Sequence, residues 1–186
     1  FGFNGFSQLA MGTFDDVNAI TKIAVNTHLA GAAGTVTGAA ITRLLGGKTD
    51  IIMMLNGALA GLVAITAEPL TPDPLLAMLI GSIGALIMYF GTKFLESKKL
   101  DDVVGAIPVH MFAGIFGTLV VPLSNPNTNF GTQLVGVISV CLFSFILSYI
   151  VFRALKQTIG LRISKEAEKL GTDKAEVGVI AYSIRD

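Results

Sequence analysis

The chain has 186 residues, of which 52% are hydrophobic and 14% charged, and its formal net charge at pH 7 is zero. This composition is too apolar for a soluble domain and indicates a membrane protein, and the zero net charge argues against a nucleic-acid partner. The single cysteine, Cys141, excludes a disulfide within the chain, and we expect it to serve in packing.

Five apolar stretches follow one another, each close to the roughly 20 residues with which a helix crosses a bilayer. They are residues 23–42, 51–67, 74–95, 103–123 and 134–152, and with their flanks they predict spans over about 18–45, 51–67, 74–95, 102–123 and 130–156. The opening FGFNGFSQLAMG lacks the basic leader of a signal peptide and predicts the end of a further span, over residues 1–12. The expected fold class is all-α, a polytopic helical membrane protein with a transmembrane domain over 1–159 and a tail over 160–186.

The basic residues fall on alternate connections between these spans, and cytoplasmic connections carry the excess of Lys and Arg. Twelve of the 13 basic residues lie in segments 43–50, 91–102 and 153–186, whereas segments 13–22, 67–73 and 122–130 hold only Lys22. This alternation predicts a cytoplasmic C-terminus. The tail holds five acidic and five basic residues and is predicted to be a solvated cytoplasmic segment.

Glycines recur at helical spacing along the spans, and small residues let helices approach closely in lipid. The pairs are Gly34 with Gly38, Gly57 with Gly61, Gly81 with Gly84, and Gly114 with Gly117. On the fourth stretch, His110, Gly114, Gly117 and Val121 have offsets that return to one side of a helix. We therefore expect His110 on a face that is packed or lines a pore.

The chain has two histidines, and both lie within predicted spans. The simpler interpretation of His110 is a hydrogen bond between helices, but ionisable groups at this depth usually line a pathway. His28 lies nearer the outer end of its span, with Asn26 and Thr27 as expected hydrogen-bonding neighbours. Two histidines and one distant cysteine do not supply the three or four ligands of a metal site.

Other motifs point away from catalysis. The sequence has no nucleophile elbow, phosphate loop or paired buried carboxylates, so we expect no enzyme activity and no cofactor. Glu68, beside Pro69, is expected in solvent, and Asp101 and Asp102 are expected to cap the helix that follows them. Transport, or sensing through a transporter-like body, is the class of function that remains.

Four segments resemble, in order and spacing, the second half of the ammonium transporter (Amt/Mep/Rh) family. They are FGFNGFS at the start, NGALAGLVAIT at 56–66, DDVVGAIPVHMFAGIFGTL at 101–119 and GLRISKEAEKLGTDKAEVGVIAY at 160–182. The resemblance implies a fold of eleven spans, two inverted five-helix repeats and a homotrimer with one pore per subunit. The chain would then run from the end of the sixth span through the second repeat, the last span and the tail, and we expect it to be a fragment without the first repeat.

The resemblance also implies roles for individual residues. Phe3 matches the second-half phenylalanine of the aromatic gate, just before Asn4, and Ser7 matches a hydroxyl that receives the cation at the outer mouth. His110 matches the second of two paired pore histidines. His28 is not the first of that pair, since the family usually has asparagine or an apolar residue there, and like Asn4 it is expected only beside the pore.

The family's function implies a mechanism. Ammonium is received at an outer aromatic site, loses its proton and crosses as ammonia through an apolar pore that contains histidine, because a charged ion there would pay a severe desolvation cost. The alternatives are an ammonium sensor or receptor of the same fold and a Rh-type gas channel. A multi-pass protein of the plasma membrane is expected, for nitrogen uptake.

The sequence departs from the family pattern at three positions. Thr172 and Val177 stand in the tail where the family usually has leucine and histidine, which weighs against the docking of a PII-type signalling protein there. Met111 follows His110 where glycine is usual, so packing beside the pore histidine is expected to differ.

Overall fold

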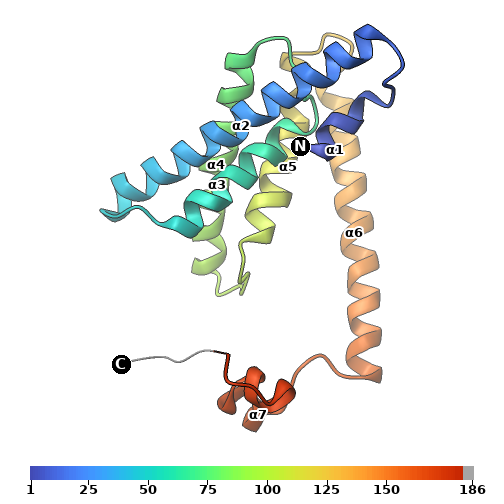
Figure 1. The fold of residues 1–186 in the computed structure, drawn as a ribbon. Coiled ribbons are helices and arrows are strands. Elements are labelled where there is room, and N and C mark those ends of the chain that lie inside the picture. The colour runs from blue at the N-terminus through green and yellow to red at the C-terminus, as the bar shows by residue number, and fades with distance from the viewer. Residues whose placement is uncertain (182–186) are drawn as a thin grey trace. The chain divides into compact units, whose positions relative to one another are not determined.

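The computed structural model describes residues 1–181, and the last five residues of the predicted tail lie outside this part (Figure 1). The α-helices are α1 (Gly2–Gly5), α2 (Phe14–Gly46), α3 (Ile51–Ile65), α4 (Pro74–Ser97), α5 (Ala113–Val120), α6 (Phe130–Thr158) and α7 (Lys165–Leu170). Single turns of 3₁₀-helix are η1 (Phe6–Gln8) and η3 (Val121–Leu123), and π-helical turns are η2 (Ile107–Phe112) and η4 (Asp173–Val177). All regular elements in the described chain are helices, which confirms the predicted all-α class.

The described part of the chain divides into two compact units, the first over residues 1–138 and the second beginning at residue 139. In the first unit, α2, α3 and α4 pack against one another, and α5 with the preceding η2 turn packs on α3 and α4 (Figure 1). The core between them consists of small and medium side chains. One cluster contains Ala30, Ala64, Ile65, Ala77 and Ile80, and the other contains Ala60, Met88, Val109 and Ala113.

Polar side chains define where the helices begin. The Thr13 hydroxyl accepts from the Asp16 backbone N–H while the Asp16 carboxylate accepts from that of Thr13, which is a capping box at the start of α2. Asp50 and Asp73 cap α3 and α4 by accepting from Met53 N at 3.0 Å and Leu75 N at 2.8 Å. Carboxylates at these positions satisfy N–H groups that would otherwise have no partner in the helix.

Glycines stand where the helices cross, as their spacing predicted. A Cβ atom on Gly34 would overlap the Gly57 carbonyl oxygen, and one on Gly81 would overlap the Ala30 carbonyl oxygen. On α5, a Cβ on Gly117 would overlap the Ala64 carbonyl oxygen. The neighbouring atoms are backbone in each case, so no side-chain rotation could make room. The prediction of close approach is confirmed for the paired glycines except Gly114, where an added Cβ would lie 3.5 Å from Val63 Cγ1, an ordinary contact distance.

Two helices in the described chain, α4 and α6, are long and apolar enough to cross a membrane. The segment Ile51–Ile65 and the segment Ile107–Leu123 are apolar but shorter. Helix α2 has 33 residues, and Asn26, Thr27 and His28 interrupt its apolar run. Whether α2, α3 and α5 also cross, and whether the domain boundary lies at residue 159, stay predictions.

The second unit contains most of α6 and the tail. Helix α6 has no buried residue in the described chain. In the tail, the Ser164 hydroxyl caps α7 by accepting from Ala167 N at 3.1 Å. The Asp173 carboxylate accepts from Ala181 N at 3.0 Å, and this bond and the Lys174 backbone N–H hold the pKa of Asp173 below its usual value.

Candidate substrate pathway

A pocket in the first unit brings together four of the residues singled out in the sequence, Phe3, Asn4, His110 and Gly114. It has a volume of about 520 Å³ and is open to the surface. Its lining residues are Phe1, Phe3, Asn4, Leu62, Val63, Thr66, Ala67, His110, Gly114 and Thr118. Phe3 and Asn4 come from α1, and His110 comes from the η2 turn, so segments far apart in the sequence share one surface. We call it the Phe3–His110 pocket.

His110 lies in a π-helical turn. The Asp102 carboxylate starts the helix by accepting from Ala106 N at 2.9 Å and Ile107 N at 2.8 Å, which confirms the predicted capping by this residue. Pro108 has no N–H to donate, and the Ala113 N–H reaches back to both the His110 and Pro108 carbonyls. A π-helical turn widens the helix locally and is frequent at functional sites.

The face predicted around His110 is divided in the structure. His110, Gly114 and Thr118, at intervals of four residues, line the pocket. Gly117 and Val121, predicted on the same face, are buried instead, with Gly117 against the Ala64 backbone. From Gly114, the step of three residues to Gly117 and the step of four to Thr118 turn in opposite directions around the helix. Helix α3 therefore covers the side that holds Gly117 and leaves the side that holds Thr118 open.

Phe3 and Asn4 have different surroundings although they are neighbours. Phe3 is 79% exposed, with its ring at the pocket surface. Asn4 is 4% exposed, and its Nδ2 donates to Thr27 Oγ1 on α2 at 3.2 Å. The buried bond ties α1 to α2, so Asn4 fixes the backbone that presents Phe3.

Ser7 and His28 are not among the lining residues. Ser7 is exposed, and its Oγ donates to the Phe3 carbonyl oxygen at 3.5 Å, within its own turn. His28 is exposed on α2, with its ring centroid 6.1 Å from that of Phe1. The neighbours expected for His28 bond elsewhere, because Asn26 donates to the Pro69 and Thr71 carbonyls and Thr27 accepts from Asn4.

Two threonines that line the pocket, Thr66 and Thr118, were not predicted as site residues from the sequence. Thr66 Oγ1 donates to the Leu62 carbonyl at 2.7 Å, and Thr118 Oγ1 donates to the Gly114 carbonyl at 2.9 Å. Because each hydroxyl proton is used within its own helix, each oxygen has only acceptor lone pairs left for the pocket. The four-residue spacing from His110 to Gly114 and Thr118 was the available signal for Thr118.

Charged side chains do not line this pocket, and His110 is its only titratable side chain among the lining residues. Glu68 lies one residue beyond the lining Ala67 and is half-buried, not solvent-exposed as expected, because its Oε2 accepts from Asn125 Nδ2 at 2.9 Å. Within residues 1–181, no three His, Cys, Asp or Glu side chains gather closely enough to hold a metal ion. The pocket therefore offers aromatic surface, acceptor oxygens and one imidazole.

The chain has clear relatives among known proteins. A model of the Ammonium Transporter Family matches residues 1–182. Ammonium transporter Amt2 of Archaeoglobus fulgidus is 40% identical, over 98% of this chain and 42% of the relative. Ammonium transporter Amt1 of the same organism is 32% identical, over 98% of this chain and 49% of the relative.

Solved structures also resemble this chain over most of its length. A protein described as "Sensor Amt Protein" superimposes with a TM-score of 0.83 and 32% identity, over 94% of this chain and 45% of that one. Mep2 of Candida albicans has a TM-score of 0.74 and 25% identity, over 86% of this chain and 40% of that one. The chain thus has their helical fold and spans less than half the length of each of these four proteins.

Proposed function

The chain belongs to the ammonium transporter family, and we propose that in the intact protein it forms one wall of a pathway for ammonium and ammonia. Its relatives are named as transporters, and the family is one of membrane proteins rather than enzymes. The observation that carries the proposal is the Phe3–His110 pocket, in which an aromatic ring and an imidazole from distant segments share one open surface. The pocket's open side would face the rest of the intact protein.

Phe3 would contact the cation on arrival. Aromatic faces attract a cation that has lost part of its water shell, and the 79% exposed ring leaves room for such a contact. Ser7, one turn further along the chain, would supply a hydroxyl oxygen at the entrance. Asn4 would act through position, by holding α1 against α2.

His110 would handle the proton. A charged ion in an apolar pore faces a large desolvation cost, which favours release of the proton and passage of neutral ammonia. Imidazole titrates near neutral pH and provides both a donor and an acceptor, so it can accept and relay that proton. The Thr66 and Thr118 oxygens, limited to accepting, would favour ligands rich in N–H groups.

The setting of this pathway is also proposed from the family and from the charge pattern. We place the protein in the plasma membrane with a cytoplasmic tail, as a homotrimer in which this chain supplies the second inverted repeat and the last span. Docking of a PII-type protein on the tail is not favoured. Thr172 and Val177 replace the usual family residues, and Val177 is 73% exposed.

The test is the His110→Ala variant of the intact protein in liposomes, with methylammonium uptake and ammonium-evoked current as readouts. We expect uptake to fall by about 100-fold, the loss typical of removing a positioned acid–base group, or ammonium-over-potassium selectivity to disappear. His28→Ala is the matched control and should keep at least half of the wild-type rate. Unchanged flux together with unchanged selectivity in His110→Ala would contradict the proposal.

A sensor is the second candidate, and one observation favours it. The structure with a TM-score of 0.83 is described as a sensor. A sensor would bind ammonium and change conformation without net flux, whereas a transporter would carry methylammonium across the liposome membrane. A Rh-type gas channel would give ammonia flux without an ammonium-evoked current. The same liposomes therefore separate all three.

A further inference from the structure

Two side-chain hydrogen bonds join the same pair of helices at opposite ends. Near the start of α3, the Asn56 Nδ2 donates to the Val104 carbonyl oxygen at 3.0 Å. Just past the end of α3, the Glu68 Oε2 accepts from the Asn125 Nδ2 at 2.9 Å. Val104 precedes η2 and Asn125 follows η3, so both bonds connect α3 with the helix formed by η2 and α5.

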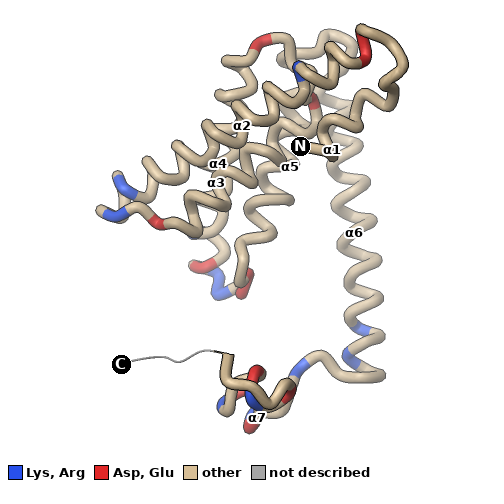
Figure 2. The backbone as a smooth tube through the Cα atoms, in the orientation of Figure 1, with Lys and Arg blue, Asp and Glu red and all other residues tan. Residues whose placement is uncertain are grey.

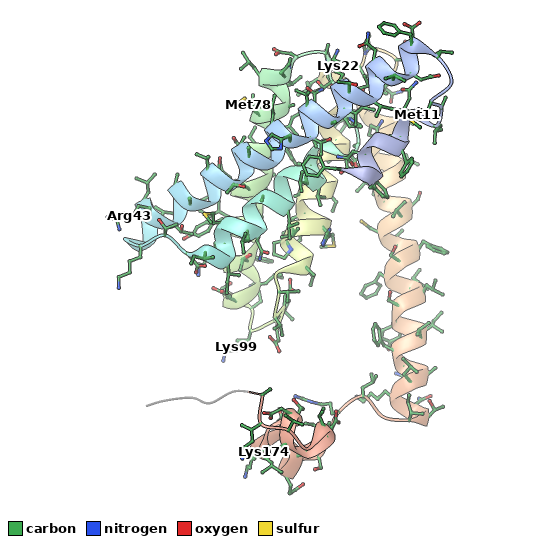
Figure 3. The ribbon with its side chains drawn as sticks, viewed as in Figure 1. Met11, Lys22, Arg43, Met78, Lys99 and Lys174 are labelled. Carbon is green, nitrogen blue, oxygen red and sulfur yellow. The ribbon has the colours of Figure 1, made fainter. Side chains whose placement is uncertain are left out.

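The loops that hold these bonds lie at opposite ends of the packed helices. Figure 3 labels Lys99, in the loop between α4 and η2, at one end, and Lys22 at the other. Asn26, one turn after Lys22, donates to the Pro69 carbonyl, which places Glu68 at the Lys22 end. Figure 2 shows acidic segments and one basic segment at that end. Within residues 1–181 Glu68 forms no ion pair, so its contact to the neighbouring loop is a hydrogen bond to a neutral amide.

Neighbouring atoms fix the orientation of both amide groups. The Asn125 Oδ1 accepts from the Asn127 backbone N–H at 3.1 Å, which leaves the Nδ2 as the group that faces Glu68. The Asn56 Nδ2 lies beside Gly105, whose φ is +72°, and a Cβ atom at that position would come within 2.8 Å of it. Glycine at 105 thus gives the amide room to reach its acceptor.

Between the two bonds, α3 and α5 touch at a crossing of small residues. A Cβ atom on Gly117 would overlap the Ala64 backbone, and one on Gly114 would lie 3.5 Å from Val63 Cγ1. Close contact at one point fixes the distance between two helices there, but it does not fix the angle between them. A hydrogen bond at each end restricts that angle.

The angle between α3 and α5 matters because both helices line the Phe3–His110 pocket. Thr66 and Thr118 line it on the side of the crossing toward the Glu68–Asn125 bond, whereas His110 lines it on the side toward the Asn56–Val104 bond. Rocking about the crossing would therefore change the spacing of the two threonine oxygens and the position of the imidazole separately.

We propose that Asn125 and Asn56 are positioning residues for the pathway, each acting on a different step. Asn125, through Glu68, holds the two threonine oxygens at the spacing that receives ammonium. Asn56, through the Val104 carbonyl, holds the imidazole of His110 where it handles the proton. This inference rests on the proposed function and assigns separate contributions to binding and to rate.

The experiment measures methylammonium uptake against concentration for the intact protein in liposomes. We expect Asn125→Ala to raise KM about five-fold and Asn56→Ala to lower the maximal rate about five-fold, the effect of one hydrogen bond, with the other constant nearly unchanged in each. Glu68→Ala should match Asn125→Ala, and the double variant should be no worse than either, because both remove the same bond. Glu68→Gln, which removes the charge and keeps an acceptor oxygen, should retain the wild-type KM.

The matched control is Asn127→Ala, the same substitution in the same exposed loop, at a side chain that makes no hydrogen bond within residues 1–181. It should keep both constants of the wild type. A KM in Glu68→Gln as high as that of Glu68→Ala would show that charge acts here and would overturn the proposal. Equal changes of KM and rate in Asn125→Ala and Asn56→Ala would also overturn it, since they would indicate a general loss of structure.

Failure of the proposed function gives a different result from failure of this inference. Absence of saturable uptake by the wild type would count against transport and leave the positioning of the binding oxygens open to a direct measurement. The methylammonium-dependent rise in Tm of the detergent-solubilised protein then reports affinity without flux. Weaker binding by Asn125→Ala than by Glu68→Gln would support the inference, and equal binding by the wild type and Asn125→Ala would overturn it.

Discussion

Helices α4 and α6 have similar apolar sequences and different surroundings. Both are long and apolar enough to cross a membrane. Nine residues of α4 are buried within the described chain, among them Gly81, Gly84 and Ala85, whereas α6 has none. Apolar character alone therefore does not distinguish a helix that packs from one that presents its side chains all round.

The distribution of small residues accounts for the difference. Lipid is as apolar as a leucine side chain, so helices associate in a membrane through close packing and not through burial of apolar surface. Along α4, Gly81 meets the Ala30 backbone and Gly84 meets Ala60 and Ala64. On α6, a Cβ atom added to Gly136 would have no neighbour within 4 Å among the described residues. Glycine spacing thus predicts where helices meet.

The largest effect should come from filling a helix crossing. In Gly81→Leu the new side chain would collide with the Ala30 backbone, which cannot rotate away, so α2 and α4 must separate. We expect a loss of about 4 kcal/mol or failure to fold, at the upper end of overpacking effects. Thermal unfolding of the intact protein in detergent measures it.

Gly136→Leu on α6 is the matched control for this substitution. The same side chain is added, also on a helix, but at a position with no neighbour within 4 Å in the described chain. Its stability should stay within about 0.5 kcal/mol of the wild type. Equal losses at both positions would mean that a helix partner outside the described residues covers this face of α6, and the contrast between the two helices would fail.

A smaller effect should come from truncating Asn26, whose side chain bonds α2 to the loop before α4. Asn26 is fully buried and donates to the Pro69 carbonyl at 3.0 Å and to the Thr71 carbonyl at 2.9 Å. Its Oδ1 has no hydrogen-bond partner within residues 1–181, so truncation also removes one unsatisfied group. We expect Asn26→Ala to cost about 2 kcal/mol, with two carbonyls left unpaired and one orphan oxygen lost.

Gln157→Ala, at the exposed end of α6, is the comparison for Asn26→Ala. It removes an amide of similar chemistry from a helix with no buried residue, and thermal unfolding should change by less than about 0.5 kcal/mol. If Asn26→Ala were equally neutral, the two buried hydrogen bonds would not hold the loop to α2, and the packed unit would owe its stability to the glycine crossings alone.

Local sequence patterns were sufficient to predict the ranges of α3 and α4 and to single out part of the site. Apolar runs gave α3 and α4 to within two residues at either end, because this signal acts over a few neighbouring positions. Glycine spacing gave the crossings. Phe3, Asn4 and His110, which the family pattern singled out, line one pocket and Ser7 does not, and their roles in a pathway stay predictions.

Contacts between distant segments could not be predicted from local patterns. Glu68 looked solvent-exposed beside a proline, but the loop after α5 brings Asn125 to its carboxylate. Asn26 was expected near His28, and it bonds instead to a loop more than 40 residues away. The π-helical turn at His110 depends on how Pro108 and the surrounding helices pack, and a regular helical period cannot represent it.

The smallest predicted effect concerns two half-buried carboxylates, Asp16 and Asp173, one in each unit. Hydrogen bonds from the Gln8 amide and the Thr13 hydroxyl hold the pKa of Asp16 below its usual value, as the Ala181 and Lys174 N–H groups do for Asp173. A lowered pKa in the folded state stabilises the fold above the unfolded-state value of about 3.9, and this contribution is lost as the pH falls through the folded value. Both contacts should therefore be constant at neutral pH and weaken below about pH 4.

The consequences of acid should differ between the two units. At the start of α2, packing of the helix against α3 and α4 remains when the Asp16 bonds are lost, so only the first turn should lose protection. In the tail, the Asp173–Ala181 bond spans eight residues of an exposed segment, and its loss should release residues 178–181. Hydrogen exchange, corrected for the intrinsic effect of pH, measures both.

Asp173→Asn should give residues 178–181 the same weakened protection at neutral pH and remove its pH dependence, and Asp16→Asn should do so only for the first turn of α2. Both carboxylates act by accepting hydrogen bonds. A difference in the number of residues that lose protection therefore measures how much the surrounding packing supports each site. Acid release of the α2 interior before the tail would reverse the expected order, since it would show that the capping bonds, and not the glycine contacts, hold α2 in place.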